Sequence, residues 1–329
     1  MISRQVSIAP MMGWTDRHAR YFLRLITKHT LLYTEMVNTG ALLHNDQHVG
    51  TQKRLLAYHA DEHPIALQLG GSDASALALC SQMAEDVGFD EVNLNVGCPS
   101  DRVKSGNFGA CLMAKPALVA DCIAAMSDRV KIPVTVKCRI GIDDMEDYES
   151  FVSFVTEVAS AGCETFIVHA RKAWLQGLSP KQNREIPPLK YDYVYRLKSE
   201  RPDLSIVING GIKTMDTVLQ QLQHVDGVML GREAYHNPYL LIEVDKTVYQ
   251  DDEAVVKTRR QIVEQICEYI NREVASGVRL HSISRHILGL YQGCHGARAW
   301  RRYLSENSHP ADADSSVVKA AMAQFEQID

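Results

Sequence analysis

Five polar residues stand at the ends of short apolar runs, where they could contribute to one binding site. They are a glutamine, a lysine, a histidine and two asparagines, namely Gln68, Asn95, Lys137, His169 and Asn209. Side chains of a strand alternate in direction, so these residues face away from the bulky apolar residues of their own runs. One of them alone could be a hydrogen-bonded structural group. Five at corresponding positions predict a site for a flat molecule with polar edges.

Two glycine segments predict that this molecule carries a phosphate. They are Asn209-Gly210-Gly211 and Gly231-Arg232, and each follows an apolar run. Glycine lets backbone N–H groups come close to a phosphate, and arginine adds a bidentate positive charge. Flavin mononucleotide (FMN) fits, because it has one phosphate and a ring with many polar edges. Lys137 would offset negative charge at the N1/O2 edge of the reduced ring, and Gln68 would hydrogen-bond the opposite pyrimidine edge.

A cysteine follows one of these runs, in the segment Asn95-Val96-Gly97-Cys98-Pro99-Ser100. Glycine and proline fix the backbone on either side of Cys98, and we expect its side chain to face the site. A thiol with a pKa near 8.5 is mostly protonated at neutral pH and can donate a proton. The alternative is a cysteine that only packs within the loop.

Eight apolar runs must position these residues. They are Val6–Ala9, Leu31–Thr34, Ile65–Leu69, Val92–Val96, Val134–Lys137, Thr165–His169, Ser205–Asn209 and Gly227–Leu230. Stretches with helical periodicity follow most of them, and this alternation is typical of βαβ units and a parallel sheet. We therefore predict an α/β fold, a (β/α)8 TIM barrel over residues 1–243. Active sites of such barrels lie at the carboxyl ends of the strands, and phosphates often bind after strands seven and eight.

After Gly231-Arg232 the alternation of strands and helices stops. Helical spacing predicts helices over 253–276, 280–290, 297–305 and 315–328, and hence an all-helical domain over 244–329. The long loop Gly97–Cys111 contains three glycines and is expected to be a mobile lid over the site.

Composition excludes several classes of protein. The chain has 329 residues and a net charge of −5, which argues mildly against a general nucleic-acid binder. Its eight cysteines form no CxxC pair, so no metal site is expected. No apolar run reaches the roughly 18 residues of a membrane span, and residues 1–5 lack the apolar core of a signal peptide. No membrane association is expected, and the predicted location is the cytoplasm. No G-x-G-x-x-G segment follows a strand, which disfavours a Rossmann domain.

Taken together, the motifs closely resemble those of the tRNA-dihydrouridine synthases, over nearly the whole chain. The matching segments are Ala9–Met11, Trp14–Arg17, Leu67–Gly70, Asn93–Ser100, Lys137–Gly141, His169–Lys172, Asn209–Gly211 and Gly231-Arg232. The Asn-x-Gly-Cys-Pro sequence is highly specific. The segment Leu178–Glu185 is most similar to the subfamily that reduces D-loop uridines 20 and 20a. Close relatives tend to carry an acid where this chain has Gly13, and Cys138 also departs from the pattern.

The resemblance implies an enzyme that uses FMN and NADPH to convert uridine in tRNA to 5,6-dihydrouridine. It assigns the following residues to FMN binding: Pro10, Met11, Met12, Gln68, Lys137, His169, Asn209, Gly210, Gly211, Gly231 and Arg232. Hydride would pass from the reduced flavin to C6 of the uracil, Cys98 would protonate C5, and Asn95 would hydrogen-bond the uracil edge. The sequence shows no motif that distinguishes NADPH from NADH.

Two basic segments could bind the tRNA despite the acidic net charge. Residues 169–184 and 279–303 contain several arginines and lysines and no acidic residue. By the resemblance, Lys181 and Arg184 in the first segment match positions that orient the tRNA. Arg298 and Arg301 in the second do the same, and their spacing of three places them on one helical face. The alternative is a solvated helix face. No obligate protein partner is expected.

Three other functions remain open on the sequence. An FMN barrel acting on a free pyrimidine, similar to dihydroorotate dehydrogenases, would share the flavin site without needing the basic helices. A desolvated Lys137 could instead form a Schiff base, as in aldolases. A non-catalytic tRNA-binding protein would need no Cys98.

Overall fold

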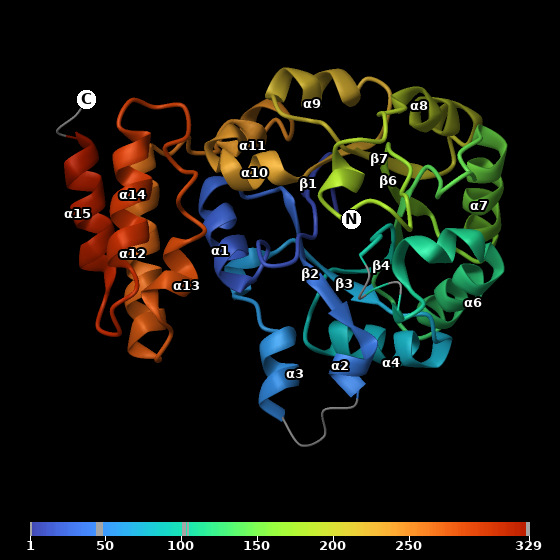
Figure 1. The fold of residues 1–329 in the computed structure, drawn as a ribbon, viewed down its shortest axis with the longest axis horizontal. Helices are drawn as coiled ribbons and strands as arrows, with labels where there is room; N and C mark the ends of the chain where they lie inside the picture. The colour runs from blue at the N-terminus through green and yellow to red at the C-terminus, as the bar shows by residue number, and fades with distance from the viewer. Residues whose placement is uncertain (1, 44–48, 101–102, 104, 327–329) are drawn as a thin grey trace.

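Eight parallel strands close into a barrel in the order β1 to β8 (Figure 1). The computed structural model describes residues 2–43, 49–100, 103 and 105–326. The strands are β1 Val6–Ile8, β2 Leu31–Asn38, β3 Ile65–Gly70, β4 Glu91–Val96, β5 Val134–Arg139, β6 Thr165–His169, β7 Ser205–Asn209 and β8 Gly227–Leu230. The predicted TIM barrel is confirmed.

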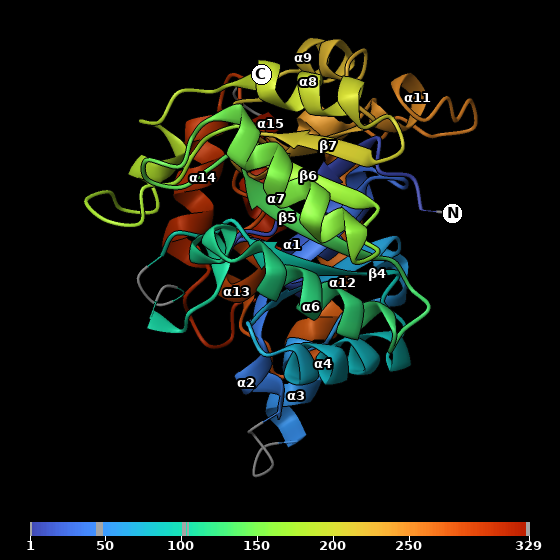
Figure 2. The same ribbon diagram turned by 90° about the vertical axis from the view of Figure 1, so that its right-hand side faces the viewer.

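Helices surround the barrel, except that α3 Val49–Leu55 projects away from it (Figures 1 and 2). They are α1 Arg17–Ile26, α2 Thr39–Leu43, α3 Val49–Leu55, α4 Ala74–Asp86, α6 Pro116–Ser127, α7 Tyr148–Ser160, α8 Tyr191–Glu200, α9 Met215–Gln221, α10 Arg232–His236 and α11 Val244–Thr247. Four 3-10 turns join them: η1 Ala60–Glu62, η2 Gly109–Ala114, η3 Gln182–Arg184 and η4 Pro238–Leu241. Most of the long helices begin at a residue whose side chain accepts hydrogen bonds from the first turn, such as Asp16, Asp73 and Asp147.

The strands divide their side chains between two cores. Residues of one parity, such as Val134 and Val136 of β5, pack under the outer helices in the large core. Residues of the other parity form a small core inside the barrel, with Ala66, Ile167 and Met229 among its members. On β5, the interior parity is that of Thr135, Lys137 and Arg139. The interior is thus apolar in part and polar towards the carboxyl ends of the strands.

Four helices follow the barrel and pack together at one side of it (Figure 1). They are α12 Arg259–Ala275, α13 Leu280–Ser284, α14 Ala297–Asn307 and α15 Ser315–Glu326. The first of the predicted helices was wrong at its start. The helix predicted from 253 begins at Arg259, because Thr258 and Gln261 form a capping box there. Of the last predicted range, residues 327 and 328 lie outside the described part of the chain.

The helix predicted over 280–290 was also wrong, because α13 ends at Ser284 and a series of turns follows. Gly289 explains the difference. A Cβ atom at this position would lie 2.5 Å from the backbone oxygen of His236, so the chain passes directly against the end of α10. Gly293 adopts a φ of +85°, which a helix does not allow. Contact with the barrel therefore overrides the helical spacing of this segment.

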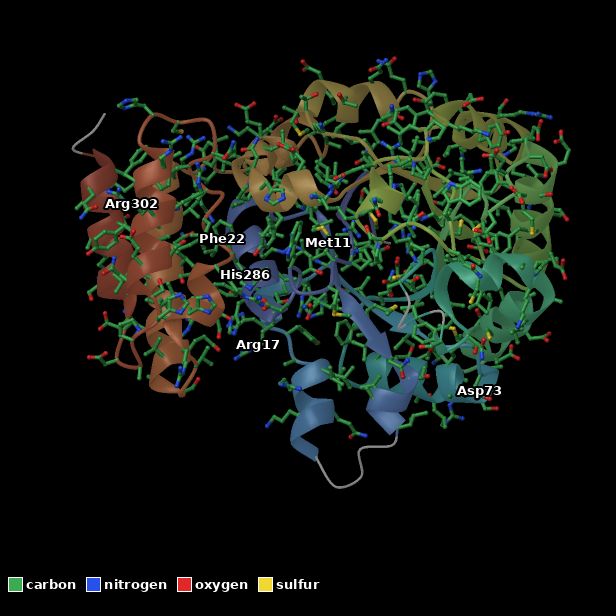
Figure 3. The ribbon with its side chains drawn as sticks, viewed as in Figure 1. Met11, Arg17, Phe22, Asp73, His286 and Arg302 are labelled. Carbon is green, nitrogen blue, oxygen red and sulfur yellow. The ribbon has the colours of Figure 1, made fainter. Side chains whose placement is uncertain are left out.

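Charged residues connect these helices to α1. Asp16 accepts hydrogen bonds from Arg285 Nη2 at 2.6 Å and His286 Nε2 at 2.9 Å. Arg17 forms an ion pair with Glu273 of α12 at 2.6 Å. Figure 3 shows Arg17 and His286 where the helices meet the barrel. In the described part of the chain, no helix is long and apolar enough to cross a bilayer.

Candidate active site

Two amides at the barrel mouth are hydrogen-bonded to each other and to the cysteine loop. Asn95 Nδ2 donates to Gln68 Oε1 at 2.8 Å. Asn95 Oδ1 accepts from the backbone N–H groups of Gly97 at 3.1 Å and Cys98 at 3.0 Å. Asn95 therefore fixes the start of the loop that carries Cys98. This position follows from the register of β4, whose last inward-facing residue is Asn95.

Cys98 is half-buried, and its Sγ lies 3.4 Å from Ser100 Oγ. The loop is compact near Gly109, where an added Cβ atom would lie 2.6 Å from the backbone oxygen of Cys98. Ala110 also donates its N–H to that oxygen at 2.9 Å. The predicted lid includes residues 101, 102 and 104, which lie outside the described part of the chain. The backbone around Cys98 is thus held from two sides.

The ammonium of Lys137 has an amide as its partner. Its Nζ lies 3.2 Å from Asn209 Oδ1, while Asn209 Nδ2 donates to Met229 O at 2.7 Å. No carboxylate pairs with Lys137 among the described residues. Burial and the neighbouring Arg139 lower the pKa of Lys137 to about 8. A partly buried cation without an anion is suited to an electron-rich ligand.

His169 ends β6 beside these cations. Burial, Arg139 and Lys137 hold the pKa of His169 well below its usual value, so its imidazole is neutral at pH 7. The chain turns closely around this ring. An added Cβ atom at Gly210, where φ is +116°, would lie 2.7 Å from His169 Cδ2. Position 210 therefore requires glycine, because a Cβ atom there would collide with the imidazole of His169.

Arg139 is a site residue that the sequence analysis placed in a motif without giving it a role. Its side chain is buried and donates to three backbone oxygens from two different loops. They are Gly97 O at 3.0 Å, Lys172 O at 3.0 Å and Asn183 O at 2.9 Å. Burial lowers its pKa to about 10, so it remains charged at neutral pH. Arg139 thus joins the Cys98 loop to the basic loop after β6, a role that only the tertiary structure reveals.

The two glycine segments lie at the ends of β7 and β8, as the sequence predicts. Gly211 has a φ of +74°, and an added Cβ atom would lie 2.5 Å from Leu189 Cδ1. Gly231 has no atom within 4 Å of such a position, so its backbone is open on that side. Arg232, the next residue, pairs with Glu185 at 2.5 Å. The site therefore has the backbone and the guanidinium group that a phosphate would need. In this structure the guanidinium of Arg232 forms an ion pair with Glu185.

The segment Pro10–Met12 follows β1 at the same end of the barrel. Thr15 fixes it by accepting a hydrogen bond from Met11 N at 3.0 Å. Met11 packs against the small core inside the barrel, and Figure 3 shows it near the centre of the barrel. Met12 is 64% exposed, which is unusual for a methionine and leaves an apolar surface at the mouth.

The basic residues predicted to contact tRNA lie on two separate elements. Lys181 and Arg184 are exposed on the loop after β6, and desolvation and the neighbouring Arg232 lower the pKa of Arg184. Asn183 between them is buried and bonds to Trp174 O at 2.9 Å, which fixes the loop. Arg298 and Arg301 lie on α14, in the helices beside the barrel. The structure thus places only the first pair beside the mouth.

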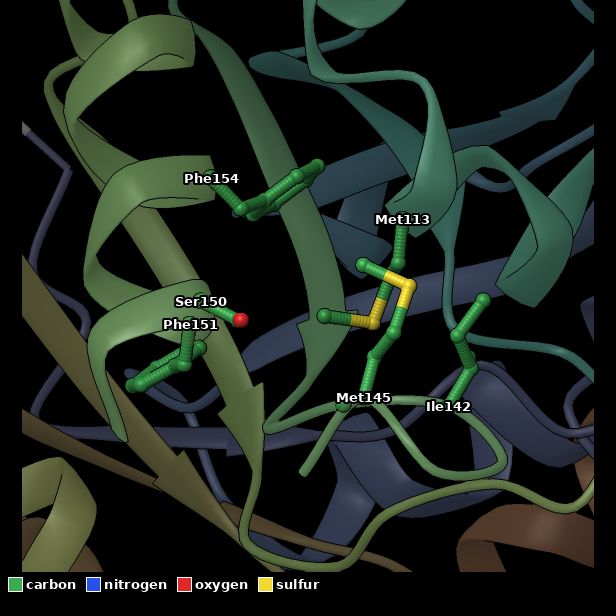
Figure 4. Close-up of a pocket in the computed structure, with 7 residues that line it drawn as sticks. Met113, Ile142, Met145, Ser150, Phe151 and Phe154 are labelled. Carbon is green, nitrogen blue, oxygen red and sulfur yellow. The ribbon is translucent and has the colours of Figure 1, made fainter. Parts of the chain in front are cut away.

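A small pocket between η2 and α7 is distinct from this site (Figure 4). Its lining is mostly apolar and includes Met113, Met145, Phe151 and Phe154. Ser150 is the one residue with a polar side chain among the described residues that line it, and the pocket lacks the charged and amide groups found at the barrel mouth. Among the described residues, no cluster of metal-binding side chains occurs.

Comparison with known proteins identifies the family. The chain matches "Dihydrouridine synthase (Dus)" over residues 7–326. It is 55% identical to the tRNA-dihydrouridine(20/20a) synthase of Vibrio vulnificus (strain CMCP6), over 99% of this chain and 98% of that protein. It is 56% identical to the enzyme of the same name from Escherichia coli (strain K12), over 97% of this chain and 91% of that protein.

Solved structures share the fold at low identity. Morphinone reductase superimposes with a TM-score of 0.51 at 12% identity, over 73% of this chain and 84% of that chain. A complex of 2-naphthoyl-CoA reductase gives a TM-score of 0.57 at 10% identity, over 74% of this chain and 50% of that chain. These two likenesses concern the barrel fold alone. The match over nearly the whole chain and the high identity to these relatives show that the chain belongs to the dihydrouridine synthase family.

Proposed function

We propose that this protein reduces uridines 20 and 20a in the D-loop of tRNA to 5,6-dihydrouridine, with FMN as cofactor and NADPH as reductant. One observation carries the proposal: Asn95 holds the Cys98 loop at the same mouth where Lys137 has no carboxylate partner among the residues that the structure describes. The curated relatives that match nearly the whole chain bear the name of this activity.

The residues at the mouth fit FMN by their chemistry. Lys137 would face the electron-rich N1/O2 edge of the ring, and Gln68 would bond a pyrimidine edge. Pro10, Met11 and Met12 would cover the ring. The remaining contacts are assigned to the end of β6 and to the phosphate segments, namely His169, Asn209, Gly210, Gly211, Gly231 and Arg232. When bound and reduced by NADPH, FMN would supply the hydride that is added to C6 of the uracil.

The protein's own groups would complete the reaction. Asn95 would hold the uracil edge, and Cys98 would donate its thiol proton to C5, the carbon next to the one that receives the hydride. Positioned proton donors of this kind contribute about 10²–10⁴-fold to rates. Lys137, as an ammonium below pH 8, would stabilise negative charge on the ring. The neutral His169 adds a hydrogen-bonding group without a further charge.

A base within folded tRNA cannot reach the barrel mouth unless it is extruded, at a cost of a few kcal/mol. Contacts to the tRNA backbone would offset this cost. Lys181 and Arg184 would bind near the mouth, and Arg298 and Arg301 on α14 would bind further along the tRNA. Residues 1–243 would thus form the catalytic domain and residues 244–329 the tRNA-binding domain.

The proposal is tested by incubating unmodified tRNA with the protein and NADPH and analysing the digested tRNA by mass spectrometry. We expect a gain of two hydrogens on D-loop uridines 20 and 20a. Replacing NADPH by NADH in a parallel reaction compares the two reductants, and a slower reaction with NADH is expected. Reduction of free pyrimidines without any reduction of tRNA would contradict the proposal.

Cys98→Ala tests the role of the thiol in the same assay. We expect dihydrouridine formation to fall at least about 100-fold, because the proton donor is lost. FMN binding should stay within about twofold of wild type. Cys294→Ala is the matched control, since Cys294 is also a half-buried free cysteine but lies in the turns between α13 and α14. Equal activity of Cys98→Ala and Cys294→Ala would refute the role of Cys98.

A further inference from the structure

A continuous series of hydrogen bonds crosses the barrel interior from the Cys98 loop to a buried ion pair at the opposite end. We refer to it as the amide chain. Its members, from the mouth inwards, are Asn95, Gln68, Asn93, Thr135 and Glu91. All are buried, and Glu91 and Asn93 have no exposed surface. Its ends, Glu91 and Asn95, lie four positions apart on β4, a length of about 13 Å at about 3.3 Å per residue.

Three links lie below the amides of the mouth. Gln68 Nε2 donates to Asn93 Oδ1 at 2.7 Å, and Asn93 Nδ2 donates to Thr135 Oγ1 at 2.9 Å. Thr135 Oγ1 in turn donates to Glu91 Oε1 at 2.8 Å. Each group therefore donates towards Glu91 and accepts from the side of the mouth.

Both ends of the amide chain impose this direction. At the inner end, the Glu91 carboxylate accepts from Tyr33 at 2.5 Å and pairs with Arg4 at 2.5 Å. A carboxylate only accepts, so Thr135 must donate to it and must accept from Asn93. At the mouth, the backbone N–H groups of Gly97 and Cys98 only donate, so Asn95 must present its oxygen to them. No amide in between can reverse without breaking two bonds.

We infer that Glu91, Asn93 and Thr135 are positioning residues, which fix the orientation of the Gln68 and Asn95 amides for ligand binding. The inference rests on the proposed function. Each of these two amides uses its oxygen and one N–H in the hydrogen bonds described above. The second N–H has no acceptor among the described residues. Gln68 and Asn95 would therefore offer N–H donors, and these suit the carbonyl oxygens of a flavin ring and of uracil.

The hydroxyl of Thr135 is the most specific point to test, because valine replaces it with a methyl group of similar size. In Thr135→Val, Asn93 loses its acceptor, and the Gln68 amide is then held in its orientation only from the side of Asn95. We expect the dissociation constant for FMN to rise about tenfold, as for one lost hydrogen bond, and kcat on tRNA to fall while KM for tRNA is unchanged. Titration of FMN-free protein with FMN and steady-state assays measure these quantities.

Two further variants separate orientation from packing. Thr135→Ser keeps the hydroxyl and loses the methyl group, so FMN binding and kcat should return to within about twofold of wild type. Thr165→Val makes the same replacement one strand away, at an inward-facing threonine outside the amide chain. It should leave both quantities within about twofold of wild type. A role in packing alone predicts the reverse order, with serine worse than valine at position 135.

The carboxylate end is tested by Glu91→Gln. Its matched control is Glu62→Gln, which alters another buried ion pair, formed with Arg20 at 2.7 Å and outside the amide chain. Both variants should lower the unfolding temperature. Only Glu91→Gln should weaken FMN binding, again about tenfold.

The outcomes distinguish this inference from the proposed function. Normal FMN binding and kcat in both Thr135→Val and Glu91→Gln would overturn the inference and leave the proposed function intact. Equal losses in Thr135→Ser and Thr135→Val would also overturn it, because the hydroxyl would then not be the cause. A wild-type protein that neither binds FMN nor modifies tRNA would overturn the proposed function itself.

Discussion

Lys137 shows how a single residue can be costly to the fold and useful to the site. Its ammonium is partly removed from water, and within the described part of the chain its partner is an amide oxygen at 3.2 Å. This raises the free energy of the charged form, which is why its pKa falls from 10.5 to about 8. A protein without a ligand at this mouth gains nothing from such a lysine. Its presence is therefore best explained by a ligand that supplies negative charge.

Lys137→Met should stabilise the FMN-free protein. Between pH 8 and pH 10.5 the unfolded chain holds a proton on Lys137 that the folded chain has lost. The destabilisation of the folded state by Lys137 is therefore complete below pH 8 and decreases as the pH rises. We expect a gain of about 2 kcal/mol in the free energy of unfolding at pH 7, and a smaller gain at pH 9.5. Urea unfolding at the two pH values measures it. A gain that grows with pH would contradict the assigned cause.

At the scale of elements, Arg139 connects loops that the strands alone would leave separate. It donates to backbone oxygens at Gly97, Lys172 and Asn183. The first loop carries Cys98, and the other carries Lys181 and Arg184. A planar guanidinium can serve several acceptors in fixed directions, which an ammonium cannot. The side chain of Arg139 thus fixes the loop that carries Cys98 relative to the basic loop.

Arg139→Lys should therefore impair chemistry and tRNA binding together. We expect a loss of about 2–4 kcal/mol in stability, because buried carbonyls lose donors, along with a lower kcat and a higher KM for tRNA. Arg24→Lys is the matched control. Arg24 donates to backbone oxygens of Lys28, Thr30 and Pro64, among others, at the opposite end of the barrel. It should lower stability but leave both kinetic constants unchanged, and equal kinetic losses in the two variants would refute the role of Arg139.

The strands were predicted well from the sequence, because the residues that determine each strand lie within the strand itself. Alternation within runs such as Thr165–His169 fixes both the strand and its inward face, and the barrel then brings the polar ends together. Arg139 could not be assigned in this way, because its acceptors are backbone atoms of distant loops. The helix predicted over 280–290 failed for a related reason, since contact of Gly289 with α10 depends on the packing of the barrel. The direction of the amide chain likewise needs the atoms of three strands.

At the scale of the whole molecule, the barrel and the four last helices meet through buried polar groups on α1. His18 Nδ1 lies 2.7 Å from Tyr269 OH, and Tyr21 of α1 stacks on Tyr269 of α12 with ring centres 4.0 Å apart. Burial and the neighbouring Arg17 lower the pKa of His18 to about 4. The imidazole is therefore neutral in the folded protein under conditions where it would be partly charged in the unfolded chain.

This predicts an acid-sensitive contact between the two parts. Between pH 6.5 and pH 4 the unfolded chain binds a proton at His18 that the folded chain does not, so stability falls as pH decreases through this range. We expect His18 to account for a loss of up to about 3 kcal/mol. Urea unfolding of wild type and His18→Gln at pH 7 and pH 4 measures the difference. The same pH dependence in both proteins would contradict the assignment.

The separation of the two basic pairs predicts that tRNA spans the mouth and α14. Arg298→Gln combined with Arg301→Gln should weaken tRNA binding and reduce the slope of log affinity against log salt by up to about 2, one for each phosphate that is no longer neutralised. Arg129→Gln is a suitable control, because Arg129 is exposed after α6, at the amino-terminal end of the barrel. Measurements of tRNA affinity at several salt concentrations test this prediction. An unchanged slope in the double variant would remove α14 from the tRNA-binding surface.

The proposed chemistry depends on a flavin at the barrel mouth, so the most direct measurement is the identity and amount of any chromophore in the native protein. The visible spectrum is recorded on undenatured protein, and the small molecule released by denaturation is identified by mass. We predict a yellow protein that releases about one FMN per chain and rebinds it, with weaker rebinding in Lys137→Met. A colourless protein that takes up no FMN on titration would contradict the proposed chemistry.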